Sequence, residues 1–344
     1  MKILKYFLIL MVASFISKTI NAADDYKPIQ PAYSDYDGMK LGFAFPDRQS
    51  MNIQKVFRDN AVNRAVELGW TPVETDAKWD PKQQSANIAA LTAQSDIEGI
   101  VMLSIDFGAN NNAAKKFEQT GRPLVTYHMG ISYKNAAHVG PNFYEMGRLL
   151  ASEMHKDLGG KGKVFFVLGD PNSDSGVNEN RGLNDWFEEN NSDIEILAVQ
   201  PAYWDSEKAK QVTKTLLQQH PDVDAIFCNW DVMCVGMGQA LEEAGLVGKV
   251  RTYIDSGSDV CFTGIEKGWY TKCAAWDTRD QVKRAVDAMS MLVASGWEYG
   301  DKPKIWNVPL FIIDKDNMND PRIRNLAFGD SSGYITGQLE FPNK

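Results

Sequence analysis

The chain has 344 residues and a formal net charge of −9 at pH 7, and this negative charge argues against nucleic acid and anionic membrane surfaces as partners. Hydrophobic residues make up 44% and charged residues 24% of the chain, which is ordinary for a globular protein. The length favours two domains over a single core.

The N-terminus has the three-part pattern of a secretory signal peptide. A basic start precedes an apolar run from Tyr6 to Ile16, and the small residues Ala22 and Ala23 follow it. The run is too short to span a membrane, and it lacks the amphipathic period of a core helix, which is the alternative interpretation. We therefore predict that residues 1–22 form a signal peptide, that residues 23–37 form a polar N-terminal leader, and that the mature protein is soluble in the periplasm.

Predicted strands and helices alternate along the first half of the remaining chain. Short apolar runs predict strands, and apolar residues spaced three and four apart predict helices. Gly69 closes the first of these helices, as glycine commonly does. The predicted strands are 41–45, 71–75, 100–103 and 123–127, and the predicted helices are 56–68, 83–93 and 113–119.

The same alternation restarts after Gly140 and Pro141. Its strands are again continuous apolar runs, and its helices again carry one apolar side. The predicted helices are 143–158, 180–189, 207–219, 232–244, 260–267 and 279–294, and the predicted strands are 163–168, 194–199, 225–227, 250–254, 271–275 and 306–313.

Continuous apolar strands that alternate with helices imply parallel sheets covered on both faces. Two such runs of similar length predict an α/β fold with two doubly wound parallel-sheet lobes. Ligands of such sheets bind outside the carboxyl ends of the strands. The residues that directly follow each predicted strand are therefore the candidates for a binding site.

The four cysteines all lie in one stretch of the second half. In an oxidising compartment they can form up to two disulfides, and the sequence does not choose among the three possible pairings. A zinc site is the alternative, but the gaps of 5, 26 and 11 residues and the lack of a nearby histidine argue against it. The cysteines are Cys228, Cys234, Cys261 and Cys273.

Three segments of the second half carry a resemblance to a known family. They are Gln200–Asp205 (QPAYWD), His220–Phe227 (HPDVDAIF) and Trp230–Gly236 (WDVMCVG). By their order and spacing, the chain resembles the periplasmic binding proteins of the ribose-type (type I) sugar-binding family over nearly all of its mature length. Segment 45–68 and the tail 314–328 are also similar to the autoinducer-2 receptor subset of that family.

The resemblance implies two lobes joined by a three-crossing hinge, with crossings near Gly140, Trp276 and Pro309. It also implies a small polar ligand, a sugar or polyol, that is held between the lobes and stabilises their closed state. The implied ranges are 38–140 with 277–308 for the N-terminal lobe, and 141–276 with 309–344 for the C-terminal lobe and tail.

The resemblance leaves two kinds of membrane partner open. With an inner-membrane ABC permease, the protein would be the solute-binding protein of a transporter. With a membrane histidine kinase, it would be a ligand sensor, as the similarity to the autoinducer-2 receptors implies. We expect a monomer with no cofactor, no metal and no nucleic-acid partner.

Two acids of the second lobe, Asp255 and Asp231, follow strands and match acids of the family. They suit a sugar, because a buried hydroxyl without a hydrogen-bond partner costs about 1–3 kcal/mol; a helix N-cap is the alternative role of Asp231. Arg181 matches a family arginine, with a salt bridge as its alternative role. Glu179 stands near the place where the sugar receptors often carry another arginine.

Three tryptophans follow strands, where flat rings can stack on the apolar face of a ligand; packing at the hinge is the alternative. They indicate a ligand with large apolar faces, such as a pyranose, a deoxy sugar or a nucleoside. In the first lobe, polar residues follow the strands and one histidine takes the place of a family Asp or Asn. The expected ligand-binding residues are Gln49, Gln54, Ser104, Asp106, His128, Arg181, Trp204, Asn229, Trp230, Asp231, Asp255 and Trp276.

No catalytic pattern in the chain is complete. Gly329–Gly333 (GDSSG) matches a nucleophile motif that requires a histidine downstream, but the last histidine is His220. Asp231 and Asp255 could form a carboxylate pair for glycoside hydrolysis, although nothing marks one of them as the acid. Segment 314–320 lacks the glycine and the final glutamate of a calcium loop. We therefore expect a binding protein rather than an enzyme.

Overall fold

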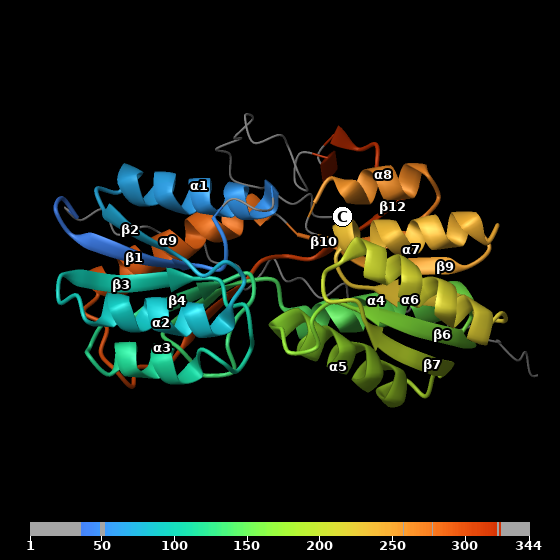
Figure 1. Ribbon diagram of the computed structural model, residues 1–344, viewed down its shortest axis with the longest axis horizontal. Helices are drawn as coiled ribbons and strands as arrows, with labels where there is room; N and C mark the ends of the chain where they lie inside the picture. Colours follow the sequence, from blue (N-terminus) through green and yellow to red (C-terminus); the bar gives the residue numbers. More distant parts are fainter. Residues whose placement is uncertain (1–35, 49–51, 257, 277, 322, 325–344) are drawn as a thin grey trace, which may run out of the picture.

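The computed structural model describes residues 36–48, 52–256, 258–276, 278–321 and 323–324. The predicted signal peptide, the predicted leader up to residue 35, Gln49 and the tail from residue 325 lie outside this range. The described residues form two lobes that lie side by side, each built on one sheet (Figure 1). Among these residues, no helix is both long and apolar enough to cross a membrane.

The first lobe is built on a six-stranded sheet with the order β11-β5-β4-β3-β1-β2, in which all neighbours are parallel. Successive side chains of a strand point to opposite faces, so Val101 packs with α1 and α9 while Ile100 and Met102 pack with α2 and α3. The strands are β1 (Lys40–Phe45), β2 (Thr71–Asp76), β3 (Ile97–Met102), β4 (Leu124–Tyr127), β5 (Ala137–Gly140) and β11 (Lys304–Asn307), and the helices are α1 (Asn52–Glu67), α2 (Pro81–Thr92), α3 (Asn111–Glu118) and α9 (Thr278–Ala294).

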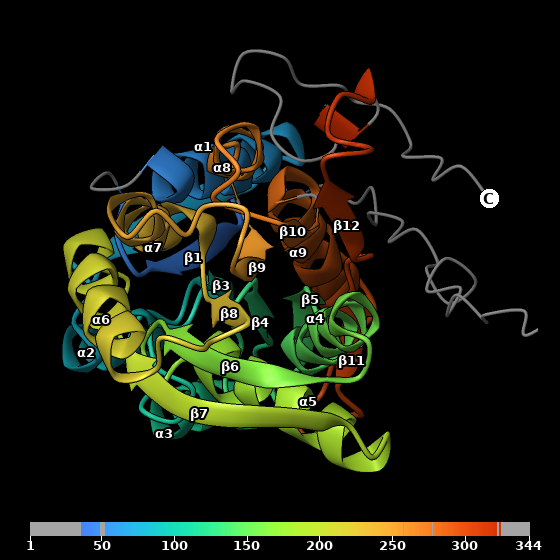
Figure 2. The same ribbon diagram turned by 90° about the vertical axis from the view of Figure 1, so that its right-hand side faces the viewer.

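The second lobe repeats this plan with the order β12-β10-β9-β8-β6-β7, which Figure 2 shows from the side of β7. All neighbours are parallel except the edge pair of β10 and β12, which is antiparallel. The predicted α/β class with two doubly wound lobes is therefore confirmed. The strands are β6 (Lys161–Leu168), β7 (Asp193–Pro201), β8 (Ala225–Cys228), β9 (Arg251–Ser256), β10 (Lys272–Ala275) and β12 (Phe311–Asp314), and the helices are α4 (Phe143–Leu158), α5 (Asp174–Glu189), α6 (Ser206–Gln219), α7 (Asp231–Glu243) and α8 (Val260–Glu266).

Three elements differ from the sequence prediction. The single strand predicted over 306–313 is wrong, because β11 and β12 belong to different sheets; Pro309 lies between them and has no N–H for a strand ladder. Strand β5 was not predicted. Helix α5 begins at Asp174 rather than at residue 180, with the Ser173 hydroxyl accepting a hydrogen bond from the Gly176 N–H.

Glycines allow α4 and α5 to pack backbone against backbone. A Cβ added at Gly147 would overlap the carbonyl of Glu179, and one added at Gly182 would overlap the carbonyl of Tyr144. Both positions lie inside helices, where glycine costs about 1 kcal/mol relative to alanine. The close packing fixes α5, and with it the buried side chain of Glu179, beneath the region between the lobes.

Candidate functional site

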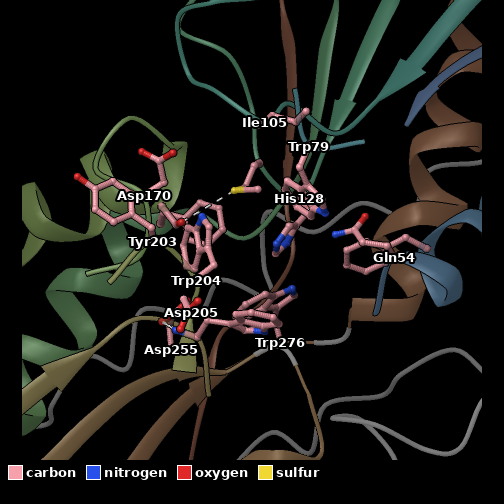
Figure 3. Close-up of a pocket in the computed structure, with 15 residues that line it drawn as sticks. Gln54, Trp79, Ile105, His128, Asp170, Tyr203, Trp204, Asp205, Asp255 and Trp276 are labelled. Carbon is pink, nitrogen blue, oxygen red and sulfur yellow. Dashed lines mark hydrogen bonds between the residues drawn. The ribbon is translucent and has the colours of Figure 1, made fainter. Parts of the chain in front are cut away.

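A cavity of about 360 Å³ lies between the two lobes and is lined from both of them. Loops after β2, β3 and β4 and the start of α1 supply one wall. Loops after β6, β7, β8 and β10, the end of β9 and the starts of α4 and α5 supply the other. This is the carboxyl-end location that the fold predicts for a ligand. The lining residues are Gln54, Phe57, Trp79, Ile105, His128, Met129, Phe143, Asp170, Ser175, Tyr203, Trp204, Asp205, Trp230, Asp255 and Trp276 (Figure 3).

His128 and Trp276 form a stacked pair at the hinge side of the cavity. Their ring centroids lie 5.5 Å apart with an interplanar angle of 25°, and the edge of Phe143 packs against both rings. Burial, followed by the proximity of His138, lowers the pKa of His128 to about 3. The imidazole is therefore uncharged at neutral pH and serves as a flat surface with a hydrogen-bonding nitrogen.

The opposite wall is formed by Trp204 and Trp230, whose rings meet edge to face with centroids 6.2 Å apart. Gly169, at the end of β6, makes room for one of these rings, since a Cβ added there would overlap Trp204. The Gly169 N–H donates to the side-chain oxygen of Asn229 at 3.0 Å. Backbone and side-chain contacts thus determine where the indole surface lies.

Five of the lining residues have left-handed backbone angles although none of them is glycine. Their φ values lie between 56° and 64°, a region that costs such residues on the order of 1–3 kcal/mol and that concentrates at functional sites. Two other non-glycine residues of the described chain, Lys78 and Asn191, have positive φ values and do not line the cavity. The five are Trp79, His128, Tyr203, Trp204 and Trp230.

Asp255 supplies the buried carboxyl of the cavity and is 4% exposed. The Asp255 carboxylate accepts a hydrogen bond from the backbone N–H of Trp230. The side-chain amide of the neighbouring Asn229 donates a hydrogen bond to Glu179. Burial raises the pKa of Asp255 to about 7. Burial also raises the pKa of Glu179 well above its usual range, and the Asp255 charge adds to this shift.

Four buried polar atoms of the lining have no hydrogen-bond partner within the part of the chain that the structure describes. They are Gln54 Oε1, Trp79 Nε1, His128 Nδ1 and Trp276 Nε1. Buried polar groups are nearly always paired in native proteins, because an unpaired one costs about 1–3 kcal/mol. Such atoms around a cavity are suited to the hydroxyl groups of a polar ligand.

Asp231 faces away from the cavity, although the sequence predicted it as a ligand-binding residue. Its carboxylate accepts hydrogen bonds from the Ser256 hydroxyl at 2.9 Å and from the Ser258 hydroxyl at 2.8 Å, and from the Cys261 N–H at 3.2 Å. It also does not cap α7, which begins at Asp231 itself. Asp231 therefore ties the end of β9 and the start of α8 to α7.

A disulfide joins Cys228 and Cys234, whereas Cys261 and Cys273 are free and buried. This is one of the pairings that the sequence left open. The bond encloses the short segment that carries Asn229, Trp230 and Asp231. The cross-link restrains the loop whose N–H group binds Asp255.

Four more predicted site residues do not line the cavity, and Gln49 lies outside the described residues. Ser104 donates to the Asp106 carbonyl at 2.7 Å, and the Asp106 carboxylate caps its own turn at Gly108. Asn229 lies beneath the lining rather than in it. The predicted residues that do line it are Gln54, His128, Trp204, Trp230, Asp255 and Trp276.

Arg181 is the fourth of these residues, and it is exposed on α5 with its guanidinium 4.6 Å from the centre of the Tyr144 ring. Because it does not reach the cavity, we expect Arg181→Ala to leave the affinity for a sugar unchanged within about twofold, as for a typical surface substitution. Isothermal titration calorimetry of the variant checks this. A tenfold loss of affinity would return Arg181 to the binding site.

Nine lining residues were not in the predicted set. The rule that ligands bind after strand ends covers Met129, Asp170 and Tyr203, and it could have found them. Phe57 and Phe143 lie inside helices that begin at the cavity, and no sequence pattern distinguishes them from core residues. The other four are Trp79, Ile105, Ser175 and Asp205.

Beside the cavity, two backbone N–H groups of the first lobe donate directly to the second lobe, and the Ser175 hydroxyl donates back to Met129 Sδ at 4.0 Å. The Phe107 N–H donates to the Asn172 carbonyl at 2.9 Å, and the Gly130 N–H donates to the Asp174 carboxylate at 2.8 Å. Both donors belong to first-lobe loops and both acceptors to the second lobe. The structure therefore represents an arrangement in which the lobes are in contact around the cavity.

The raised pKa of Asp255 predicts a pH dependence of stability in the ligand-free protein. Its folded-state pKa of about 7 exceeds the ordinary value of 3.8, so the folded state holds the extra proton and stability falls as pH rises through this window, by up to about 1.4 kcal/mol per pH unit. We expect Asp255→Asn to reduce this slope, measured by urea unfolding between about pH 5 and pH 8, while Asp231, whose pKa burial also raises to about 7, leaves a remaining slope in the variant. Equal slopes in both proteins would contradict the assignment.

Comparisons with known proteins add to this geometry. A family model described as a periplasmic binding protein domain matches residues 41–296. The D-allose-binding periplasmic protein of Escherichia coli (strain K12) is 26% identical over 297 residues, which cover 81% of this chain and 88% of that protein. The ribose import binding protein of the same organism is 28% identical over 192 residues, covering 55% of this chain but only 63% of that protein.

Solved structures share the fold. The Caulobacter myo-inositol binding protein bound to myo-inositol has a TM-score of 0.74 at 22% identity, covering 86% of this chain and 99% of that one. A solute binding protein from Burkholderia graminis in complex with D-arabinose has a TM-score of 0.74 at 18% identity, covering 83% and 99%. At these identities the structural likeness concerns the fold alone.

Proposed function

The chain belongs to the periplasmic binding protein domain family, and on that premise we propose that it captures a sugar or polyol between its lobes in the periplasm and delivers it to an inner-membrane ABC permease. The protein would act as a monomer that binds without chemical change of the ligand. The signal peptide expected at residues 1–22 supports the periplasmic location.

One observation carries the proposal: the cavity combines flat aromatic walls with buried, unpaired polar atoms. Trp204 and Trp276 contribute indole rings to the cavity lining, and Asp255, near the end of β9, contributes a buried carboxyl acceptor. A sugar has this same division, with apolar C–H faces and directional hydroxyls at its edge. A volume of about 360 Å³ holds roughly twelve water molecules, so one small sugar fits.

The contacts across the cleft support capture by closure. A ligand that touches both walls stabilises the closed arrangement by its differential contacts with the two lobes. The hydrogen bonds from Phe107 and Gly130 to the second lobe would add to the same state. A permease can then recognise the closed form by its shape.

Uptake is preferred over sensing because of the named relatives. One is described as an import binding protein for ribose and another as a D-allose-binding periplasmic protein. The histidine-kinase alternative rests on the resemblance of segments 45–68 and 314–328 to autoinducer-2 receptors. Residues 322 and 325–328 of the second segment lie outside the described residues. It stays a prediction of the sequence.

A thermal-shift screen tests the proposal. A ligand at 100 times its Kd stabilises the folded state by about 2.7 kcal/mol, so a cognate sugar should raise the melting temperature by several degrees. The panel consists of pentoses, hexoses, deoxy sugars, inositols and nucleosides, each at about 1 mM. If only a compound that is neither a sugar nor a polyol raises the melting temperature, the sugar assignment is wrong.

A further inference from the structure

The charge of the cavity lining is one-sided. Three aspartates belong to it: Asp255 is buried, whereas the carboxylates of Asp170 and Asp205 accept hydrogen bonds from the N–H groups of Asn172 and Lys208. Among the residues that the structure describes, no lysine or arginine lines the cavity. The single lining histidine, His128, is held uncharged by burial, which lowers its pKa. A ligand with a negative group would therefore meet carboxylates without a compensating cation.

Another acidic side chain, that of Glu179, lies behind Asp255 and outside the cavity lining. Glu179 is fully buried, lies next to Asn229 and Asp255, and has one carboxyl oxygen without a partner. The groups that most influence Glu179 and Asp255 are burial, other carboxyls and neutral hydrogen-bond donors rather than a cation. The two carboxyl groups also lie within hydrogen-bond reach of each other, so in the ligand-free protein a shared proton stands where a cation would pair with them. A ligand cation beside Asp255 would replace that proton.

The aromatic walls of the cavity also favour a cationic group in the ligand. The backbone N–H of Trp230 donates a hydrogen bond to Asp255, and the Trp230 ring meets the ring of Trp204 edge to face. Trp276, whose ring meets that of Phe143 edge to face, also lies beside Asp255 (Figure 3). Indole faces attract cations through their quadrupole, most strongly where water is excluded. Neutral sugars need such faces only for their apolar surface, whereas an ammonium group uses both the rings and the carboxylate.

We propose that the ligand is a sugar or polyol that carries a positively charged amino group, and that this group binds at Asp255 among the indole rings. The inference rests on the proposed function, because the hydroxyl groups of the same ligand use the cavity's unpaired polar atoms. Gln54 Oε1, an acceptor, and Trp276 Nε1, a donor, belong to the lining and have no partner among the described residues. The amino group supplies the positive charge that the described lining lacks.

Matched ligand series test this inference by isothermal titration calorimetry near pH 7, where an amine of ordinary pKa is charged and Asp255, with a pKa of about 7 in the ligand-free protein, can give up its proton to pair with it. The series are D-glucosamine, N-acetyl-D-glucosamine and D-glucose; D-galactosamine, N-acetyl-D-galactosamine and D-galactose; and 1-amino-1-deoxysorbitol with sorbitol. We expect at least one amino compound to bind roughly 10- to 100-fold more tightly than its neutral partners, as for a hydrogen bond between charged groups.

The outcomes separate the two proposals. If the neutral compounds bind as tightly as the amino compounds or more tightly, this inference is overturned while the sugar-binding function stands. If no compound of the series binds while a neutral sugar or polyol of the thermal-shift panel does, this inference is again overturned and the sugar-binding function stands; if no sugar or polyol of either set binds, both are overturned. In Asp255→Asn, the ratio of amino to neutral affinity should fall towards one, whereas a purely structural role of Asp255 would weaken both classes equally and would contradict the assignment of the ammonium site.

Discussion

Asp255→Asn is expected to weaken the binding of the cognate sugar by roughly 10- to 100-fold. A hydrogen bond to a charged acceptor contributes about 1.5–3 kcal/mol, and Asp255 is the buried carboxyl of the cavity lining. Asparagine keeps an oxygen that can accept the bond from the Trp230 N–H, so the loop should keep its conformation. The loss is measured as the change in Kd by calorimetry.

Asp106→Asn is the matched control for this substitution. The sequence predicted Asp106 as a ligand-binding residue too. In the structure its carboxylate accepts hydrogen bonds from the N–H groups of Gly108 and Ala109 at 2.7 Å, and Asp106 does not line the cavity. We expect an unchanged Kd for the control. If the two variants lose affinity to the same extent, the location of the site between Asp255 and the tryptophans is incorrect.

The second large effect is expected at Gly169. An added Cβ would overlap the Trp204 ring, and forced overpacking of this kind costs about 1–3 kcal/mol. Gly169→Ala should therefore lower the free energy of unfolding by that amount and displace an indole wall of the cavity. Displacement of a preorganised wall should reduce sugar affinity by roughly tenfold or more.

A double-mutant cycle distinguishes this cause from a general effect of alanine. In Trp204→Ala the ring is gone, so adding Gly169→Ala to that variant should cost almost nothing in stability. Gly108→Ala is the control, since a Cβ there would have its nearest neighbour at 3.7 Å. If the cost of Gly169→Ala is the same with and without Trp204, the contact between them does not explain it.

Local patterns predicted the regular elements of the fold well. The predicted helix 143–158 coincides with α4, because Asn142 caps its start and Gly159 ends it with a φ of 68°. Strand β5 was missed, since the four residues Ala137–Gly140 become a strand only by pairing with β4 and β11. Four residues are too few to show the hydrophobic periodicity from which a strand is predicted.

The candidate site was predictable in position but less so in its residues. The strand-end rule located the cavity, but it could not say which way a side chain points. Glu179 and Arg181 lie two positions apart on α5, which is about 200° around a helix, so one is buried and the other exposed. The left-handed angles at Trp204 and Trp230 likewise depend on tertiary contacts that no local pattern records.

A crystal structure of the protein with the sugar that gives the largest thermal shift tests the central claim most directly. We expect one ligand molecule in the cavity between the lobes, with a ring face on an indole of Trp204 or Trp276 and a polar group within hydrogen-bond distance of Asp255. A sugar bound elsewhere on the protein, with this cavity filled only by water, would contradict it.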